Sequence, residues 1–228
     1  MRLGGLQKLT LLDYPGKTAC TVFTEGCNFR CPFCHNASLV KNRSVELPLD
    51  EFFSFLKKRQ GLLDGVCVTG GEPLMQSDIE DFLYEIKELG YSVKLDTNGS
   101  FPDKLKNIVA KGLCDYVAMD IKNSKSKYLA TAGVTRDILS DIEESVSFLL
   151  SDAVDYEFRT TVVDPLHDHS DFYEIGAWIK GAKRYFLQNF IDSGDLLSDG
   201  MQSYTKEKLE SFALVLQGFV PNVALRGV

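Results

Sequence analysis

The chain has 228 residues, of which 44% are hydrophobic and 25% are charged, a composition typical of a soluble globular protein. It carries 25 basic and 32 acidic side chains, and the net charge of −7 disfavours binding to nucleic acid or to an anionic membrane surface. No apolar run approaches the roughly 18 residues that span a bilayer, and the first ten residues lack the apolar core of a secretory signal. We therefore expect a cytoplasmic protein.

Six short β-rich segments alternate with helical patterns at intervals of about one β-α unit. The predicted strands are Ala19–Thr24, Val66–Thr69, Ser92–Asp96, Tyr116–Ile121, Tyr156–Val163 and Arg184–Leu187. The predicted helices are Leu49–Lys58, Ser77–Leu89, Pro102–Ala110, Asp137–Leu150, one opened by Asp171 and Glu174, and one near the end through Leu209 and Leu216. Nearly continuous apolar strands that alternate with helices predict a parallel α/β sheet.

The number of strands indicates how far this sheet closes. A complete eight-stranded barrel typically takes about 250 residues, so six strands in this length favour an open, partial (β/α)6 barrel. We expect a single domain over residues 1–228, with a core at about 18–190 and a helical and strand extension at 191–228. Ser77 followed by Glu80 predicts a capping box at the start of one helix.

Three of the six cysteines lie within eight residues, in the segment Glu25-Gly-Cys27-Asn-Phe-Arg-Cys31-Pro-Phe-Cys34-His-Asn36. In a cytosolic chain such a cluster indicates a metal site rather than a disulfide. Thiolates are the ligands of iron–sulfur clusters, and three of them leave one iron of a cubane open to a small molecule.

Two other interpretations of these cysteines remain open. A zinc site with His35 is one, although the adjacent Cys34 and His35 side chains point apart and no second half-site follows. Chance core cysteines are the other, but these are expected on apolar strands, as at Cys20, Cys67 and Cys114, and not in a polar loop.

Polar segments follow several of the predicted strands. In Thr69-Gly70-Gly71-Glu72-Pro73 the adjacent glycines let the backbone approach a ligand closely, and Glu72 can pair with an ammonium group. The segments Asp96-Thr97-Asn98-Gly99 and Met119-Asp120-Ile121-Lys122 end two later strands. Parallel α/β folds place ligand sites at the carboxyl ends of their strands, so we expect the binding site there.

These motifs together resemble the radical S-adenosylmethionine superfamily, in which C-x3-C-x2-C with an aromatic residue before the third cysteine is followed by a GGEP turn. The segments Asp13-Tyr-Pro-Gly-Lys17 and Cys34-His35-Asn36 are similar to those of activating enzymes of glycyl-radical proteins. The nearest resemblance is to the longer form of anaerobic ribonucleoside-triphosphate reductase activating proteins, and it spans about residues 6–190.

The resemblance implies that Cys27, Cys31 and Cys34 hold a [4Fe–4S] cluster at which S-adenosylmethionine is reductively cleaved. The residues that it implies for contact with S-adenosylmethionine are Phe33, His35, Gly70, Gly71, Glu72, Thr97, Asn98, Asp120, Lys122, Arg159 and Gln188. It further implies a monovalent cation at Asp96, Thr97 and Asp120. A histidine of the related pyruvate formate-lyase activating enzyme corresponds to Ile191 here, so recognition of the adenine is expected to differ.

The implied function is that of a radical SAM oxidoreductase that generates a glycyl radical on a partner enzyme, which we expect to be anaerobic ribonucleoside-triphosphate reductase. We expect a flavodoxin- or ferredoxin-type electron donor, with no nucleic acid and no membrane as partner. Residues 1–43 hold six basic and two acidic side chains, and this basic segment is expected to border the cluster and attract an acidic donor.

Two alternative functions remain at this stage. One is a radical SAM enzyme that acts on a small molecule, like 7-carboxy-7-deazaguanine synthase, a family that usually has an aspartate after the third cysteine where this chain has His35. The other is a non-enzymatic zinc or iron–sulfur binding module. The segment Asp164–His169 is expected to be a solvated polar loop without a metal.

Overall fold

The structure, a computed structural model, describes residues 1–41 and 43–228, and its contacts divide the chain into two compact units. Unit 1 comprises Met1–Asn28, Ser38–Thr97 and Asp103–Val117. Unit 2 comprises Phe29–Ala37, Asn98–Pro102 and Ala118–Val228. Three elements extend across a boundary between these segments, namely α1 (Ala37–Val40), α4 (Pro102–Ala110) and β5 (Tyr116–Asp120).

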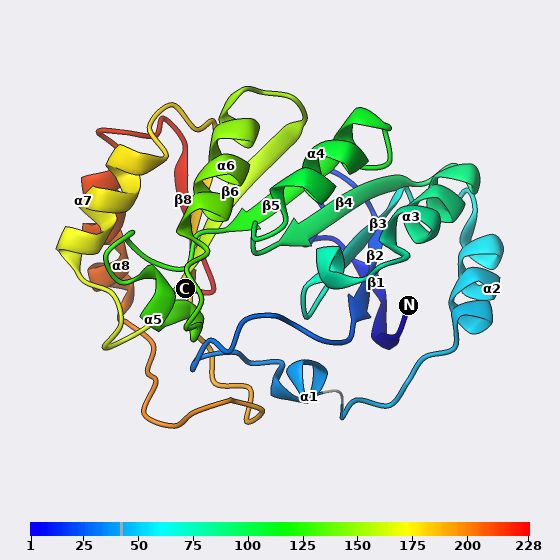
Figure 1. Cartoon of the computed structure of the whole chain (residues 1–228), viewed down its shortest axis with the longest axis horizontal. Helices are drawn as coiled ribbons and strands as arrows, with labels where there is room; N and C mark the ends of the chain where they lie inside the picture. The colour runs from blue at the N-terminus through cyan, green and yellow to red at the C-terminus, as the bar shows by residue number, and fades with distance from the viewer. Residues whose placement is uncertain (42) are drawn as a thin grey trace. The chain divides into compact units, whose positions relative to one another are not determined.

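Unit 1 is built on four neighbouring strands with helices beside them (Figure 1). The strands are β1 (Leu3–Thr10), β2 (Ala19–Thr24), β3 (Gly65–Gly70) and β4 (Ser92–Thr97). The helical elements that lie wholly within it are α2 (Leu49–Arg59), the short 3₁₀ helix η1 (Pro73–Met75) and α3 (Ile79–Glu88). β1 pairs antiparallel with β2, whereas β2 with β3 and β3 with β4 are parallel.

The core of unit 1 follows from the apolar pattern of its elements. The apolar positions of α3, Ile79, Phe82, Leu83 and Ile86, recur at helical spacing and are all buried. Phe52 of α2 stacks on Phe82 at a ring-centroid distance of 5.4 Å. The helices therefore cover strands that are themselves buried along most of their length, as a parallel sheet requires.

The segment between β1 and β2 packs at the end of the sheet where β2 begins. Tyr14 is buried, its hydroxyl donates to the carbonyl oxygen of Val93 at 3.4 Å, and its ring lies 6.0 Å from that of Tyr116. Thr21 donates to the Asp13 carboxylate at 2.6 Å. The Asp13–Lys17 motif therefore has a structural role at the amino ends of the strands.

Unit 2 contains three paired parallel strands: β6 (Asp155–Val162), β7 (Tyr185–Asn189) and β8 (Val223–Arg226). Its complete helices are α5 (Tyr128–Ala132), α6 (Leu139–Leu150), α7 (His169–Trp178) and α8 (Lys206–Leu216). Helices α7 and α8 lie side by side (Figure 1), where the rings of Phe172 and Phe212 approach to 4.6 Å.

The predicted open α/β fold with parallel strands is confirmed. All six predicted strands are present, the strand order follows the chain order, and β1 and β8 are edge strands, so the sheet does not close. The sequence patterns missed β1 and predicted β8 only as an unplaced strand within the 191–228 extension. The expectation of a single domain over residues 1–228 stays a prediction. Among the described residues, no helix is long and apolar enough to cross a membrane.

Three helix starts differ from the prediction by two residues, and the first is α6, which begins at Leu139 rather than at Asp137. The capping box at Ser77 and Glu80 is wrong: α3 begins at Ile79 after Asp78, whose side chain makes no capping hydrogen bond. Helix α7 begins at His169 rather than at Asp171. Asp168 and Asp171 form a capping box there, in which each carboxylate accepts from the backbone N–H of the other residue, and this places Asp171 inside the first turn.

Candidate functional site

The three clustered cysteines lie where the chain passes from one unit to the other. Cys27 belongs to unit 1, three residues after β2 ends, and Cys31 and Cys34 belong to unit 2. The N–H of Cys34 donates to the carbonyl oxygen of Cys31 at 3.0 Å, which makes a tight turn between the last two cysteines. Burial raises the pKa of Cys31 to about 11, although the Lys122 ammonium acts in the opposite direction.

Two contacts fix this turn within unit 2. The N–H of Arg30 donates to the carbonyl oxygen of Ala132 at the end of α5, at 2.9 Å. The next residue, Gly133, has a φ of +66°, and a Cβ there would lie 2.1 Å from the Arg30 carbonyl oxygen. Only glycine satisfies both requirements, so the end of α5 packs directly against the cysteine turn.

The Gly70–Glu72 turn docks against the carboxyl end of β2. The N–H of Gly71 donates to Thr24 O and that of Glu72 to Gly26 O, both at 2.8 Å. The Glu72 carboxylate is buried and accepts from the backbone N–H of Leu74 at 3.1 Å and from the Thr97 hydroxyl at 2.8 Å. Glu72 thereby connects the ends of β3 and β4. The residue that its N–H contacts, Gly26, directly precedes Cys27 in the chain.

In unit 2, Asp120 and Lys122 at the carboxyl end of β5 form a charged cluster with Arg159, which lies in the middle of β6 and not at the end of its strand. Asp120 accepts from Lys122 at 3.0 Å and from Arg159 at 2.9 Å. Burial alone would raise the pKa of Asp120, but the two cations outweigh it and hold the pKa well below its usual range. Burial would likewise lower the pKa of Lys122, but Asp120 outweighs it and the pKa is raised. All three groups are therefore charged at neutral pH, with two cations around one carboxylate.

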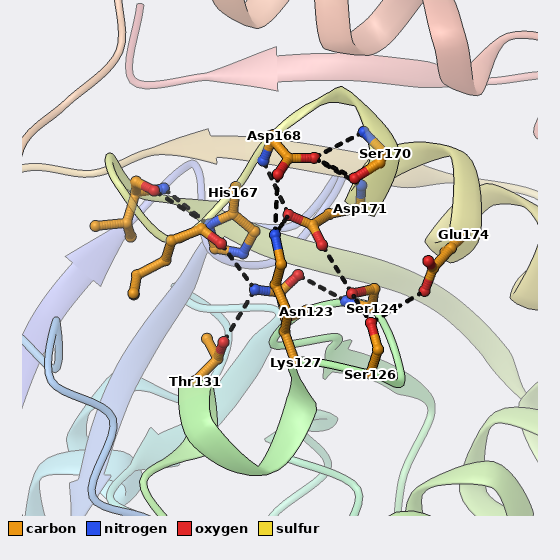
Figure 2. Close-up of polar contacts among 12 residues, drawn as sticks. Asn123, Ser124, Ser126, Lys127, Thr131, His167, Asp168, Ser170, Asp171 and Glu174 are labelled. Atoms are coloured by element: carbon orange, nitrogen blue, oxygen red, sulfur yellow. Dashed lines mark hydrogen bonds and ion pairs between the residues drawn. The ribbon is translucent and has the colours of Figure 1, made fainter.

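The chain that follows this cluster is held by a buried hydrogen-bond network from the Asp164–His169 segment (Figure 2). His167 is 1% exposed. Its Nδ1 accepts from the N–H of Val163 at 3.1 Å, which assigns the proton to Nε2, and Nε2 donates to the carbonyl oxygen of Lys122 at 2.9 Å. Asn123 donates to the carbonyl oxygen of Leu166 at 3.0 Å.

The network continues to the first turn of α7. Asp171 accepts from Ser124 at 2.8 Å and from Lys127 at 2.7 Å, and Lys127 also reaches Asp168 at 2.9 Å (Figure 2). The expectation of a solvated loop at Asp164–His169 is thus wrong for His167. The sequence contained a signal in Asp168 and Asp171, a capping pair that fixes a helix start directly after His167.

The remaining predicted residues have the following places. Phe33 is buried, His35 is exposed, Gln188 is half-buried on β7 and Ile191 is 65% exposed. Asn98 accepts from the backbone N–H and the hydroxyl of Ser100 at 3.0 and 2.6 Å, and so shapes the chain after β4.

Asp96 of unit 1 and Asp120 of unit 2, both predicted to bind a monovalent cation, are each paired with side-chain cations of the protein. Lys94 of β4 is paired with Asp96, and Lys122 and Arg159 with Asp120. The sequence analysis missed Lys94, although the period of two in a strand predicts that Lys94 and Asp96 share a face.

The cysteine donors fit an iron–sulfur cluster by their chemistry, since three thiols on a short loop are the ligands that such clusters use. In the part of the chain that the structure describes, no three His, Cys, Asp or Glu side chains converge on a position for a single metal ion. Cys20, Cys67 and Cys114 are buried, as expected for core cysteines.

The basic side chains of residues 1–43 are divided between the two ends of β2: Arg2 pairs with Glu25 at 2.8 Å beside the cysteine loop, whereas Lys8 and Lys17 lie at the opposite end. Lys17 lies two residues before β2, whereas Cys27 lies three residues after it. Six residues of strand separate the two by about 20 Å. Lys8 lies near the same end as Lys17, because Thr10 pairs with Ala19. The expectation that the whole segment borders the cysteine loop is therefore wrong.

Comparison with known proteins identifies the family. The radical SAM superfamily model matches residues 21–175. A protein of Methanocaldococcus jannaschii with the provisional name glycyl-radical enzyme activating enzyme MJ1227 is 28% identical over 99% of this chain and 96% of its own length. The 7-carboxy-7-deazaguanine synthase of Thermoplasma acidophilum is 29% identical over 92% of this chain and 93% of its own length.

Among solved structures, Streptococcus suis SuiB bound to precursor peptide SuiA shares the fold with a TM-score of 0.73 at 16% identity. The alignment covers 91% of this chain and 48% of SuiB, so this chain spans about half the length of that structure. The family model matches more than half of the chain, and the shared fold agrees with this match. The chain therefore belongs to the radical SAM superfamily, whose members use a [4Fe–4S] cluster and S-adenosylmethionine.

Proposed function

We propose that this chain is an activating enzyme that generates a glycyl radical on a partner protein, with anaerobic ribonucleoside-triphosphate reductase as the expected partner. The observation that carries the proposal is the match along nearly the whole chain to the M. jannaschii protein named for that activity. When bound and reduced by an external one-electron donor, the [4Fe–4S] cluster would supply the electron for cleavage of S-adenosylmethionine to methionine and a 5′-deoxyadenosyl radical, the species that would take a hydrogen atom from a glycine Cα.

Each group of side chains has a part in this proposal. Cys27, Cys31 and Cys34 would ligate three irons of the cluster and leave the fourth to the cosubstrate. The Gly70–Glu72 turn would receive the methionine ammonium, a role supported by the buried Glu72 carboxylate and by two backbone hydrogen bonds that fix the turn.

In unit 2, Asp120, Lys122 and Arg159 carry two positive charges and one negative charge. Such a cluster suits an anionic group, and we assign it to the methionine carboxylate and the neighbouring ribose. His167 would keep Lys122 in place through its backbone carbonyl. Phe33, His35, Thr97, Asn98 and Gln188 are proposed to complete the contacts with S-adenosylmethionine.

The experiment is an anoxic incubation of this chain with S-adenosylmethionine, a reductant of the flavodoxin or ferredoxin type and the candidate partner. Electron paramagnetic resonance of the partner should show a glycyl radical, with one 5′-deoxyadenosine formed for each radical. The Cys34→Ala variant is the control and should give neither product. A partner without radical signal, in the presence of active S-adenosylmethionine cleavage, would contradict the proposed function.

A second candidate is the formation of a 7-deazaguanine from a carboxypterin. The match over 92% of this chain to the T. acidophilum 7-carboxy-7-deazaguanine synthase favours it. The same anoxic mixture with the carboxypterin in place of the protein partner tests this candidate. Turnover of the pterin without a partner would establish the second function and exclude the first as the main activity.

A further inference from the structure

A charged pair is buried within the sheet of unit 1. Lys94 lies in the middle of β4 and is 0% exposed, and its ammonium group contacts the carboxylate of Asp96, which is 9% exposed. Lysine is almost never fully buried unless it is paired, because removal of the ammonium from water is costly. The contact with Asp96 therefore accounts for the presence of Lys94 among apolar strands.

Cys67 of β3 completes the arrangement. It is the register partner of Lys94 and is fully buried. Its Sγ lies 3.7 Å from the Lys94 ammonium nitrogen and 3.7 Å from the Asp96 carboxylate oxygen. A thiol accepts a hydrogen bond from an ammonium and donates one to a carboxylate, so Cys67 contacts both members of the pair.

This pair lies at the start of a chain of contacts to the Gly70–Glu72 turn. Asp96 is followed by Thr97, whose hydroxyl donates to Glu72 at 2.8 Å. Glu72 in turn accepts from the N–H of Leu74. Any displacement of Asp96 moves the last residues of β4 and so moves the Thr97 hydroxyl that holds Glu72.

We infer that Lys94 is a built-in counter-ion of Asp96, a positioning residue that fixes the end of β4 and takes the place of a free monovalent cation at Asp96. The wild-type chain should consequently be indifferent to the identity of the monovalent cation in solution. The consequence for S-adenosylmethionine binding at the Gly70–Glu72 turn rests on the proposed function, whereas the pairing of Lys94 with Asp96 does not.

The test replaces Lys94 by methionine, which keeps the length of the side chain and removes its charge. Thermal unfolding of the anaerobically purified chain is followed without S-adenosylmethionine, in chloride salts of tetramethylammonium, potassium or ammonium at equal ionic strength. Loss of one partner of a buried ion pair should lower the Tm of K94M by roughly 6–20 °C in the tetramethylammonium salt. Ammonium or potassium, which are small enough to reach Asp96, should recover part of this loss, while the wild-type Tm stays the same in all three salts.

Lys111→Met is the matched control. Lys111 pairs with Glu80 at 2.5 Å at the surface, with side-chain exposures of 52% and 34%. An exposed ion pair contributes little, so the Tm of K111M should fall by no more than about 4 °C and show no cation dependence. If K94M does not fold, the double variant K94M/D96N removes both charges and should fold with a Tm that no cation affects.

Three results would overturn the inference: an unchanged Tm for K94M, a loss that neither small cation reverses, or a double variant no more stable than K94M. A second readout is the KM for S-adenosylmethionine in its reductive cleavage, which should rise in K94M and fall again with ammonium or potassium. Failure of the wild-type chain to cleave S-adenosylmethionine would refute the proposed function and leave the Tm test of Lys94 intact.

Discussion

Substitution of Gly71 by alanine tests how closely the Gly70–Glu72 turn must approach β2. A Cβ at this position would lie 1.9 Å from the carbonyl oxygen and 2.6 Å from the carbonyl carbon of Gly26. Ordinary van der Waals contact begins at 3.4 Å, so one of the two backbone segments must move by 3.4 − 1.9 = 1.5 Å. The hydrogen bond from the N–H of Glu72 to the same oxygen, now 2.8 Å, cannot survive that movement.

The movement has a cost in stability and a larger one in catalysis. Steric overpacking of this kind typically costs about 1–3 kcal/mol, which corresponds to a fall in Tm of roughly 2–12 °C for a chain of this size. A misplacement of about 1 Å at a substrate-positioning group lowers the rate about 100-fold. We therefore expect the Gly71→Ala variant to remain folded but to lose most of its reductive cleavage of S-adenosylmethionine.

The assay is formation of 5′-deoxyadenosine by the reduced, cluster-loaded variant, together with its iron content and thermal unfolding. Gly5→Ala is the matched control, because a Cβ there would lie 3.7 Å from its nearest neighbour, the Phe23 side chain. Its cleavage rate and Tm should match those of the wild type. A Gly71→Ala enzyme with wild-type cleavage kinetics would refute the role given to this turn.

Three further predictions concern stability and cofactor content. Arg226→Met removes a guanidinium that donates to the buried Glu157 carboxylate at 2.8 and 3.0 Å, and it should cost about 3 kcal/mol in denaturant unfolding. A loss no greater than that of the surface variant Arg184→Met would be contrary. Burial lowers the pKa of His167 in the folded protein. The stability that neutral His167 contributes is therefore complete above its unfolded pKa of about 6.5, and it is lost as the pH falls through the pKa of the folded state. The free energy of unfolding should therefore fall less steeply with decreasing pH in His167→Gln than in the wild type. An unchanged pH dependence would exclude this role for His167. Cys34→Ala should reduce bound iron and sulfide to background while Cys20→Ala retains both, and equal iron in the two variants would contradict the ligand set.

The sequence predicted the parallel strands well because their apolar runs reflect burial on both faces, which is a local signal. β2 extends over the predicted residues Ala19–Thr24, and α4 over Pro102–Ala110. β1 was missed and β8 was predicted only as an unplaced strand of the 191–228 extension, for a physical reason. β1 contains Gly4 and Gly5 and has one face partly exposed, and β8 has only four residues, so neither shows a continuous apolar pattern.

The sequence predicted only those residues of the candidate site that lie within recognisable motifs. Motifs predicted the cysteines, the Gly70–Glu72 turn and Asp120, each next to a strand end. The supporting residues Lys94 and His167 come from elsewhere in the chain, and their roles depend on burial and on contacts between strands or between loop and strand. A lysine in a strand or a histidine in a polar loop is usually solvated, so only the fold distinguishes these two from ordinary surface residues.

The proposed activity requires that three cysteine thiolates leave one iron of the cluster accessible to the sulfonium cosubstrate. The most direct measurement is electron paramagnetic resonance of the anaerobically purified and reduced chain, before and after addition of S-adenosylmethionine. We expect a cluster signal whose g values change on addition, with the changed fraction of the signal proportional to the cosubstrate bound. A signal that stays the same with saturating S-adenosylmethionine, or a preparation that contains zinc and no iron, would contradict it.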